Sequence, residues 1–191
     1  VAQNDAFLPQ MIDFSPPGDV YTHIVGTDIV RTGQDEFFVL EDNARTPSGV
    51  SYMLENRETM LQMFPELFSK TRVQAVSNYP RNLHKSLAAC APAATDGPAT
   101  VAVLTPGIFN SAYFEHAYLA KEMGAELVEG SDLVVGDDDC VYMKTINGLD
   151  RVDVIYRRID DLFLDPEVFN PDSALGVPGL MRAWRNGHWL R

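Results

Sequence analysis

The residues of this sequence best suited to chemistry lie in the stretch FFVLEDNARTPSG, residues 37–49. Glu41 and Asn43 stand two residues apart on an apolar run with strand character, so their side chains point to the same face. Carboxylate and amide oxygens are hard ligands of the kind that Mg²⁺ prefers. The stretch therefore indicates a magnesium site. A strand end whose polar residues merely bond to the following turn would show the same pattern.

A second carboxylate, Asp28, precedes this stretch in the extended segment YTHIVGTDIVR. A short polar loop separates the two runs, which predicts an antiparallel hairpin. Asp28 and Glu41 can then face each other across the hairpin, where two carboxylates repel unless a cation joins them. That cation is either a metal ion or the guanidinium of Arg31 or Arg45, and the residues alone leave both open.

A third polar group follows the short apolar strand predicted over residues 100–105. Because parallel sheets bind ligands at the carboxyl ends of their strands, this group forms a possible substrate corner. An ordinary capped helix over residues 111–123 explains it equally well. Its members are Asn110, Ser111, Glu115 and His116.

Two adjacent arginines, Arg157 and Arg158, follow a predicted buried strand over residues 151–157. Guanidinium groups can hold a carboxylate or phosphate through paired hydrogen bonds. The aspartates at 160, 161 and 165 can equally serve as helix caps or as partners for these arginines. The structural interpretation is slightly favoured.

The elements that position these groups change character along the chain. After Gly49 we predict a helix that ends or kinks at Pro65, then a second helix near residues 82–90 and a linker over 91–98. From Thr100, strand, helix and strand alternate, which predicts a parallel sheet, with a hairpin over residues 132–145 attached to it. Only Gly107 stands between the first strand and its helix, so a dinucleotide phosphate loop is rejected.

Composition limits the classes of partner. The 191 residues are 46% hydrophobic and carry a net charge of −12, which disfavours nucleic acid as a partner. The sequence holds no apolar run long enough to span a membrane. Cys90 and Cys140 have no metal-type spacing. We expect a cytoplasmic protein with free thiols and no membrane partner.

Several long motifs resemble, in order, those of the circularly permuted ATP-grasp family, a bacterial group related to glutathionylspermidine synthetase. They are VGTDIVR, FFVLEDNARTPSGVSYMLENR, LTPGIFNSAYFEHAYLAKEMGAELVEGSDLV and VDVIYRRIDDLFLDP. The resemblance extends from about Tyr21 to Arg191. It implies an α/β fold, in which an antiparallel hairpin from the permuted ATP-grasp domain precedes a Rossmann-like pre-ATP-grasp domain with parallel strands.

The resemblance also implies residue roles. Asp28, Glu41 and Asn43 match the ligands that hold Mg²⁺ on the phosphates of ATP. Arg45, Ser48 and Gly49 would lie near phosphate or substrate, and Arg31 and Arg45 would act as catalytic arginines. Family members continue into a nucleotide lobe that this sequence lacks, so we expect a fragment whose partner is the missing remainder of its own chain.

The implied activity is ATP-dependent ligation of a small-molecule carboxylate to an amine through an acyl phosphate. We expect this fragment alone to be inactive. The expected domains are residues 1–70 (metal-binding portion), 71–98 (helix and linker) and 99–191 (Rossmann-like). The alternative is a non-catalytic scaffold or interaction protein that keeps the fold.

Overall fold

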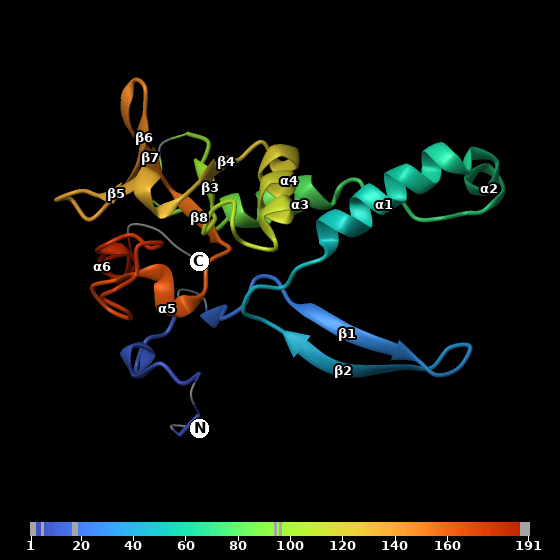
Figure 1. Ribbon diagram of the computed structural model, residues 1–191, viewed down its shortest axis with the longest axis horizontal. Helices are drawn as coiled ribbons and strands as arrows, with labels where there is room; N and C mark the ends of the chain where they lie inside the picture. The colour runs from blue at the N-terminus through green and yellow to red at the C-terminus, as the bar shows by residue number, and fades with distance from the viewer. Residues whose placement is uncertain (1–2, 5, 17–18, 94, 96, 188–191) are drawn as a thin grey trace.

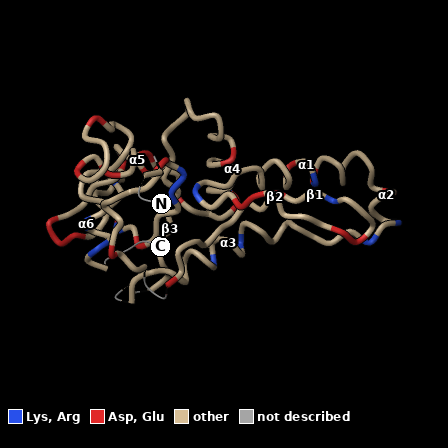
Figure 2. Tube along the Cα trace, turned by 90° about the horizontal axis from the view of Figure 1, so that it is seen from below, with Lys and Arg blue, Asp and Glu red and all other residues tan. Residues whose placement is uncertain are grey.

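The computed structural model describes residues 3–4, 6–16, 19–93, 95 and 97–187. Two arms extend from a body in the same direction, one a strand hairpin and the other a pair of helices (Figure 1). The two arms overlie each other in the view turned by 90° (Figure 2), so they run alongside one another. In chain order the elements are η1 (Pro9–Met11), β1 (Gly26–Arg31), β2 (Phe37–Asn43), α1 (Val50–Met63), α2 (Pro65–Lys70), α3 (Tyr79–Ala88), β3 (Val101–Leu104), α4 (Tyr113–Met123), β4 (Glu126–Val128), η3 (Gly130–Asp132), β5 (Leu133–Val135), β6 (Val141–Thr145), β7 (Gly148–Val152), β8 (Val154–Arg157), α5 (Asp161–Leu164) and α6 (Leu180–Arg185).

The hairpin arm consists of β1 and β2, which pair antiparallel with a bulge next to Asp28. The predicted hairpin is confirmed, but β1 begins only at Gly26, where its partner strand ends opposite at Asn43. Every residue of β2 is exposed. A two-stranded hairpin without a packed face is marginally stable in water. The arm therefore lacks, within the described residues, the packing that would stabilise it.

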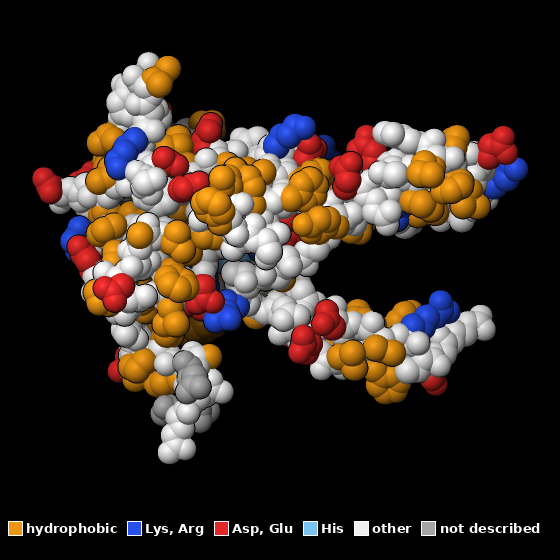
Figure 3. All heavy atoms as spheres, in the orientation of Figure 1, with side chains coloured by type: hydrophobic (Ala, Val, Ile, Leu, Met, Phe, Trp, Pro, Cys, Tyr) orange, Lys and Arg blue, Asp and Glu red, His pale blue; other side chains and the backbone are white. Residues whose placement is uncertain are grey.

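The helical arm consists of α1 and α2, which meet at Pro65. The predicted helix break is confirmed there, because proline fits the first turn of a new helix but has no N–H for the preceding one. Gly49, with φ 109°, is the N-cap of α1. Apolar side chains along this arm are exposed (Figure 3), among them Tyr52, Met53, Leu61, Met63, Phe64 and Leu67.

The body is built on a parallel sheet with strand order β4, β3, β8. This confirms the predicted strand, helix and strand alternation. Successive residues of β3 point to opposite faces. Val101 and Val103 pack with Leu87 of α3 and Leu119 of α4 on one face. The other face packs against a second cluster that includes residues of β5 to β7 and of α6.

The predicted single strand over residues 151–157 is wrong. Residues 151–152 end β7, which pairs with β6, whereas β8 begins at Val154 and pairs with β3. The chain changes sheets at Asp153, whose carboxylate accepts the Thr100 N–H at 2.9 Å. The predicted hairpin over residues 132–145 forms, but as part of a separate antiparallel sheet of β5, β6 and β7.

Two further expectations can be compared with the structure. Cys90 and Cys140 are not joined by a disulfide bond. None of the helices in the described ranges is both long and apolar enough to span a bilayer.

Candidate active site

The hairpin brings the three predicted metal ligands together. Asp28 and Glu41 are direct cross-strand partners, and Asn43 lies two residues beyond Glu41 on the same face. Asn43 Nδ2 donates to Glu41 Oε1 at 3.3 Å. The neighbouring Asp42 faces the other way, where it accepts the Thr27 hydroxyl at 2.7 Å. We call Asp28, Glu41 and Asn43 the metal corner.

The metal corner suits a hard divalent cation that shares its coordination with phosphate and water. It offers two carboxylates and one amide oxygen on one exposed face. Mg²⁺ is commonly held by one or two carboxylates together with substrate phosphates and waters. Within the described part of the chain, no three His, Cys, Asp or Glu side chains gather into a metal-binding cluster. The donors present therefore fit Mg²⁺ on a phosphate ligand better than a cage made only of protein groups.

The two predicted catalytic arginines lie at opposite ends of the hairpin. Arg31 donates from Nε to the Gly33 carbonyl at 2.8 Å and from a terminal nitrogen to the Gln34 carbonyl, so it braces the loop at the tip. Arg45 lies beyond β2, where its guanidinium is 3.3 Å from the Asp160 carboxylate on the body. The structure therefore does not place the two guanidinium groups together.

The predicted phosphate-side residues Ser48 and Gly49 form the turn that joins the two arms. Gly49 has φ 109°, a left-handed conformation that favours glycine. The Gly49 N–H donates to Glu115 Oε2 at 2.6 Å. The turn between the metal corner and α1 is thus tied to the body by a side chain of α4.

Glu115 and Arg158 form a buried ion pair beneath this turn. Their side chains are 0% and 2% exposed, and Arg158 donates to Glu115 Oε1 at 3.1 Å. Glu115 Oε2 also accepts the Ser51 N–H at 3.2 Å, which places a negative charge at the positive end of α1. Arg158 in turn donates to the Pro47 carbonyl at 2.6 Å. We call this pair the Glu115–Arg158 clamp.

Tyr156 and His116 complete the surroundings of the clamp. The Tyr156 hydroxyl accepts from Arg158 at 3.2 Å, and burial raises the pKa of Tyr156. Burial and, secondarily, the charge of Arg158 lower the pKa of His116 to about 4. His116 Nδ1 is hydrogen-bonded to the Thr105 hydroxyl at 2.8 Å. A neutral His116 suits this arrangement, since its Nδ1 can accept the hydroxyl proton.

The four residues of the predicted substrate corner separate into two settings. Asn110 and Ser111 lie in the loop before α4, and Asn110 Oδ1 accepts the Ala112 N–H at 2.9 Å. Glu115 and His116 are buried on α4 and bonded to protein groups. A role in substrate binding remains a prediction for all four.

The two adjacent arginines pair with different protein carboxylates, and a role for either in binding a ligand stays a prediction. Neighbouring residues at the end of a strand point to opposite sides. Arg158 points inward to Glu115, whereas Arg157 pairs with Asp161 at 2.5 Å. Asp160 caps α5 through the Leu162 N–H, and Asp165 accepts the Met181 N–H at 2.8 Å. The structural interpretation of Asp160 and Asp165 is confirmed.

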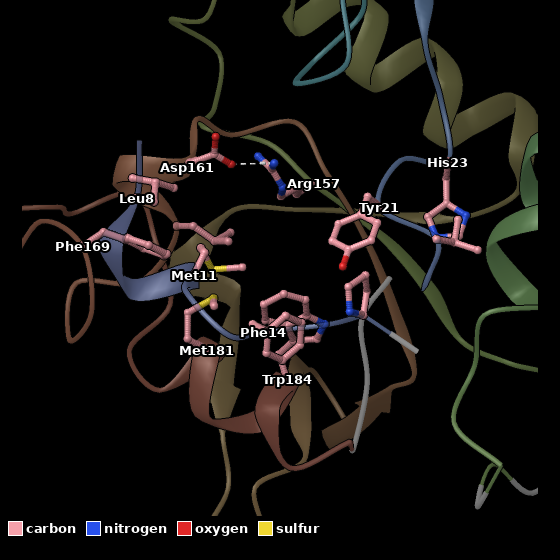
Figure 4. Close-up of a pocket in the computed structure, with 13 residues that line it drawn as sticks. Leu8, Met11, Phe14, Tyr21, His23, Arg157, Asp161, Phe169, Met181 and Trp184 are labelled. Carbon is pink, nitrogen blue, oxygen red and sulfur yellow. Dashed lines mark ion pairs between the residues drawn. The ribbon is translucent and has the colours of Figure 1, made fainter. Parts of the chain in front are cut away.

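Arg157 lines a cavity of about 340 Å³ between the segment before β1 and helices α5 and α6. The Arg157–Asp161 pair lies on one side of it and the Phe14 and Trp184 rings on the other, with Tyr21 and His23 at the edge (Figure 4). The ring centroids of Phe14 and Trp184 are 3.9 Å apart. The sequence motifs did not point to this cavity, because its walls come from distant parts of the chain.

The fold and the site together define an α/β protein in which Asp28, Glu41 and Asn43 share one face of a projecting hairpin. A family model described as circularly permuted ATP-grasp type 2 matches residues 1–190. The chain belongs to the circularly permuted ATP-grasp type 2 family.

The chain is similar to several longer bacterial proteins. An uncharacterized protein of Synechocystis sp. is 55% identical over 187 residues, which cover 98% of this chain and 38% of that protein. An uncharacterized protein of Mycobacterium tuberculosis is 52% identical over 188 residues, covering 98% of this chain and 34% of the relative. A Frankia casuarinae protein named "Putative glutamate--cysteine ligase 2-2" is 43% identical over 169 residues, covering 88% of this chain and 20% of that protein. The chain thus spans little more than a third of its first two relatives.

Proposed function

We propose that this chain is the metal-binding part of an ATP-dependent carboxylate–amine ligase. The observation that carries the proposal is the cross-strand pairing of Asp28 with Glu41, with Asn43 on the same face, in a chain of an ATP-grasp family. The name of the Frankia relative suggests glutamate as the first carboxylate and cysteine as the first amine to test. We further infer that β3, β4, β8 and α4 form a Rossmann-like pre-ATP-grasp portion, related to that of glutathionylspermidine synthetase.

The metal corner would hold Mg²⁺ through the Asp28 and Glu41 carboxylates and the Asn43 amide oxygen. When bound, the ion supplies positive charge to the phosphates and to the phosphoryl group in transfer. Orientation of the ligands comes from the hairpin pairing and from the hydrogen bond between Asn43 and Glu41. No protein nucleophile is required, because the substrate carboxylate itself takes the phosphoryl group.

The reaction that we propose has two steps. A substrate carboxylate oxygen attacks the terminal phosphorus of ATP, which forms an acyl phosphate and releases ADP. The amine then attacks the acyl carbon, loses a proton and expels inorganic phosphate, which leaves an amide. Arg45, Ser48 and Gly49 follow the corner directly in the chain, which supports a place for them beside the phosphate or the substrate.

The full-length protein would complete the site with its remaining polypeptide. Both arms carry exposed apolar side chains on the described residues, which include Phe37, Phe38, Val39 and Leu40 on β2. Relatives that this chain spans by 38% and 34% have the additional length to cover them. We propose that this remainder packs on the arms and supplies the nucleotide lobe. A cytoplasmic location stays a prediction.

The test compares Glu41→Gln with Asp42→Asn in the full-length protein. Both variants remove one carboxylate charge from adjacent positions of β2, but only Glu41 lies on the face of the metal corner. With Mg²⁺, ATP, glutamate and cysteine, we expect ADP formation to fall by about 100-fold or more in Glu41→Gln, because transition-state charge is no longer balanced. Asp42→Asn should keep the unchanged protein's rate within about threefold.

Equal rates in the two variants would refute the metal corner. If the unchanged protein forms no ADP with a panel of carboxylates and amines that includes amino acids and polyamines, the ligase proposal fails. The non-catalytic scaffold would then be the better account of this fold.

A further inference from the structure

The buried Glu115–Arg158 clamp holds the turn between the metal corner and α1 by three backbone groups. Glu115 Oε2 accepts the N–H groups of Gly49 and Ser51, at 2.6 and 3.2 Å. Arg158 holds the carbonyl of Pro47 at 2.6 Å. Three backbone groups within five residues are therefore fixed by two charged side chains, one on α4 and one on the residue that follows β8.

The two partners join elements that the chain keeps far apart. Glu115 and Arg158 are separated by 43 positions, and Glu115 and Ser51 by 64. The clamp is buried, whereas a second ion pair between this region and the body, Arg45 with Asp160, is exposed at 57% and 38%. Exposed ion pairs contribute little and are screened by salt. The clamp is thus the stronger constraint on the turn.

Stability alone is a weak reason for such a pair. Burying two charges costs desolvation free energy that their attraction only partly returns, and apolar side chains of similar size are often at least as stabilising. Here Arg158 Nε is also buried without a hydrogen-bond partner among the described residues. The pair leaves a buried donor unsatisfied, yet it bonds three backbone groups of one turn, and this combination favours a positioning role.

We propose that Glu115 and Arg158 are positioning residues that set the metal corner relative to the α/β body. The inference rests on the proposed ligase function for its catalytic consequence. The turn begins four residues after Asn43, so its orientation determines the direction in which the hairpin leaves the body. A displacement of about 1 Å at a reacting centre can cost about 100-fold in rate. The clamp would act on the reaction through this geometry without contact with the substrate.

The experiment compares Glu115→Gln with Glu122→Gln in the full-length protein. Both changes remove one carboxylate on α4, but residue 122 is exposed and lies outside the clamp. Hydrogen exchange measured by NMR or mass spectrometry reports the amides of Gly49 and Ser51 directly. We expect at least tenfold faster exchange at these amides in Glu115→Gln, unchanged exchange in β3, and no change in Glu122→Gln.

Kinetics then separate positioning from a merely structural contact. For Glu115→Gln and Arg158→Lys we expect kcat to fall by tenfold or more, with KM for ATP changed by less than about threefold. Unchanged exchange at Gly49 and Ser51 would overturn the clamp itself. Faster exchange with an unchanged kcat would overturn the positioning role.

Faster exchange throughout β3 would show that a variant has unfolded. If Glu115→Gln unfolds, the comparison uses Arg158→Lys, which keeps the positive charge. If the unchanged protein shows no ligase activity, the proposed function and the positioning role fail together. The exchange result still decides whether the clamp holds the turn.

Discussion

At the scale of single residues, burial determines whether a titratable side chain is charged near neutral pH. His116 is 2% exposed and faces Thr105, and burial is the main reason that the pKa of His116 falls to about 4. Its sequence position suggested a substrate ligand, and that role stays a prediction. Because His116 is buried, we expect its protonation to change the free energy of unfolding with pH.

The expected pH dependence follows from the direction of this pKa change. Below its ordinary pKa of about 6.5, an unfolded His116 binds a proton that the folded protein does not accept until about pH 4. The folded state therefore loses stability as the pH falls from 6.5 to 4, on the order of 3 kcal/mol in total. Urea unfolding at pH 7 and 4.5 measures this loss.

Replacement of His116 by Gln removes the titrating group and should flatten the dependence. His84→Gln, on α3, serves as the control and should keep the slope of the unchanged protein. A slope that is the same in His116→Gln and His84→Gln would contradict the assignment.

At the scale of elements, the body is held by close approaches of backbone as well as by apolar side chains. Gly176 lies before α6, and a Cβ there would stand 2.1 Å from the Phe163 carbonyl oxygen and 2.4 Å from that of Leu164. Only glycine lets the segment before α6 pass so near α5. The neighbouring Val177 N–H donates to the Leu164 carbonyl at 3.0 Å, which fixes the same approach.

Gly176→Ala should therefore destabilise the protein by about 1–3 kcal/mol or more, because the added methyl meets backbone atoms that cannot rotate away. Gly33→Ala is the matched control in the hairpin loop, where the new Cβ would meet only the Glu36 side chain within 3.5 Å. Urea midpoints measure both variants. An unchanged midpoint in Gly176→Ala would show that α5 and α6 do not approach as described.

At the scale of the whole molecule, the two arms leave apolar surface uncovered on the described residues. Figure 3 shows this surface on both arms and the open space between them. The polar metal corner lies on the same hairpin as Phe38 and Leu40, which are 59% and 68% exposed. The metal corner lies on an exposed face of the hairpin. A phosphate ligand bound there would be enclosed only if further polypeptide packs over that face.

The 191 residues by themselves should therefore bind Mg-ATP weakly or not at all, whereas the full-length protein should bind it. Isothermal titration calorimetry with and without Mg²⁺ measures both affinities. Tight, Mg-dependent binding of ATP by the 191-residue chain would contradict the proposed completion of the site. Titration with ADP in place of ATP controls for nonspecific nucleotide binding.

Local patterns in the sequence were sufficient for much of the framework. Alternation and turn residues predicted the hairpin, and with it the approach of Asp28 to Glu41, because the cross-strand partners lie close to one loop. The parallel sheet followed from the strand, helix and strand order. The hairpin depends on interactions between near neighbours in the chain, which periodicity records.

Only the tertiary structure decided how distant polar residues pair. Arg157 and Arg158 are adjacent, yet one meets Asp161 and the other Glu115, since successive strand residues point to opposite sides. The division of residues 151–157 between two sheets depends on partners in β6 and β3 that no local pattern names. The approach of Asp28 to Glu41 and Asn43 could be predicted from the sequence, because a single hairpin brings these residues together. The Glu115–Arg158 clamp could not be predicted, because its two residues meet only when α4, β8 and the turn at Gly49 pack together.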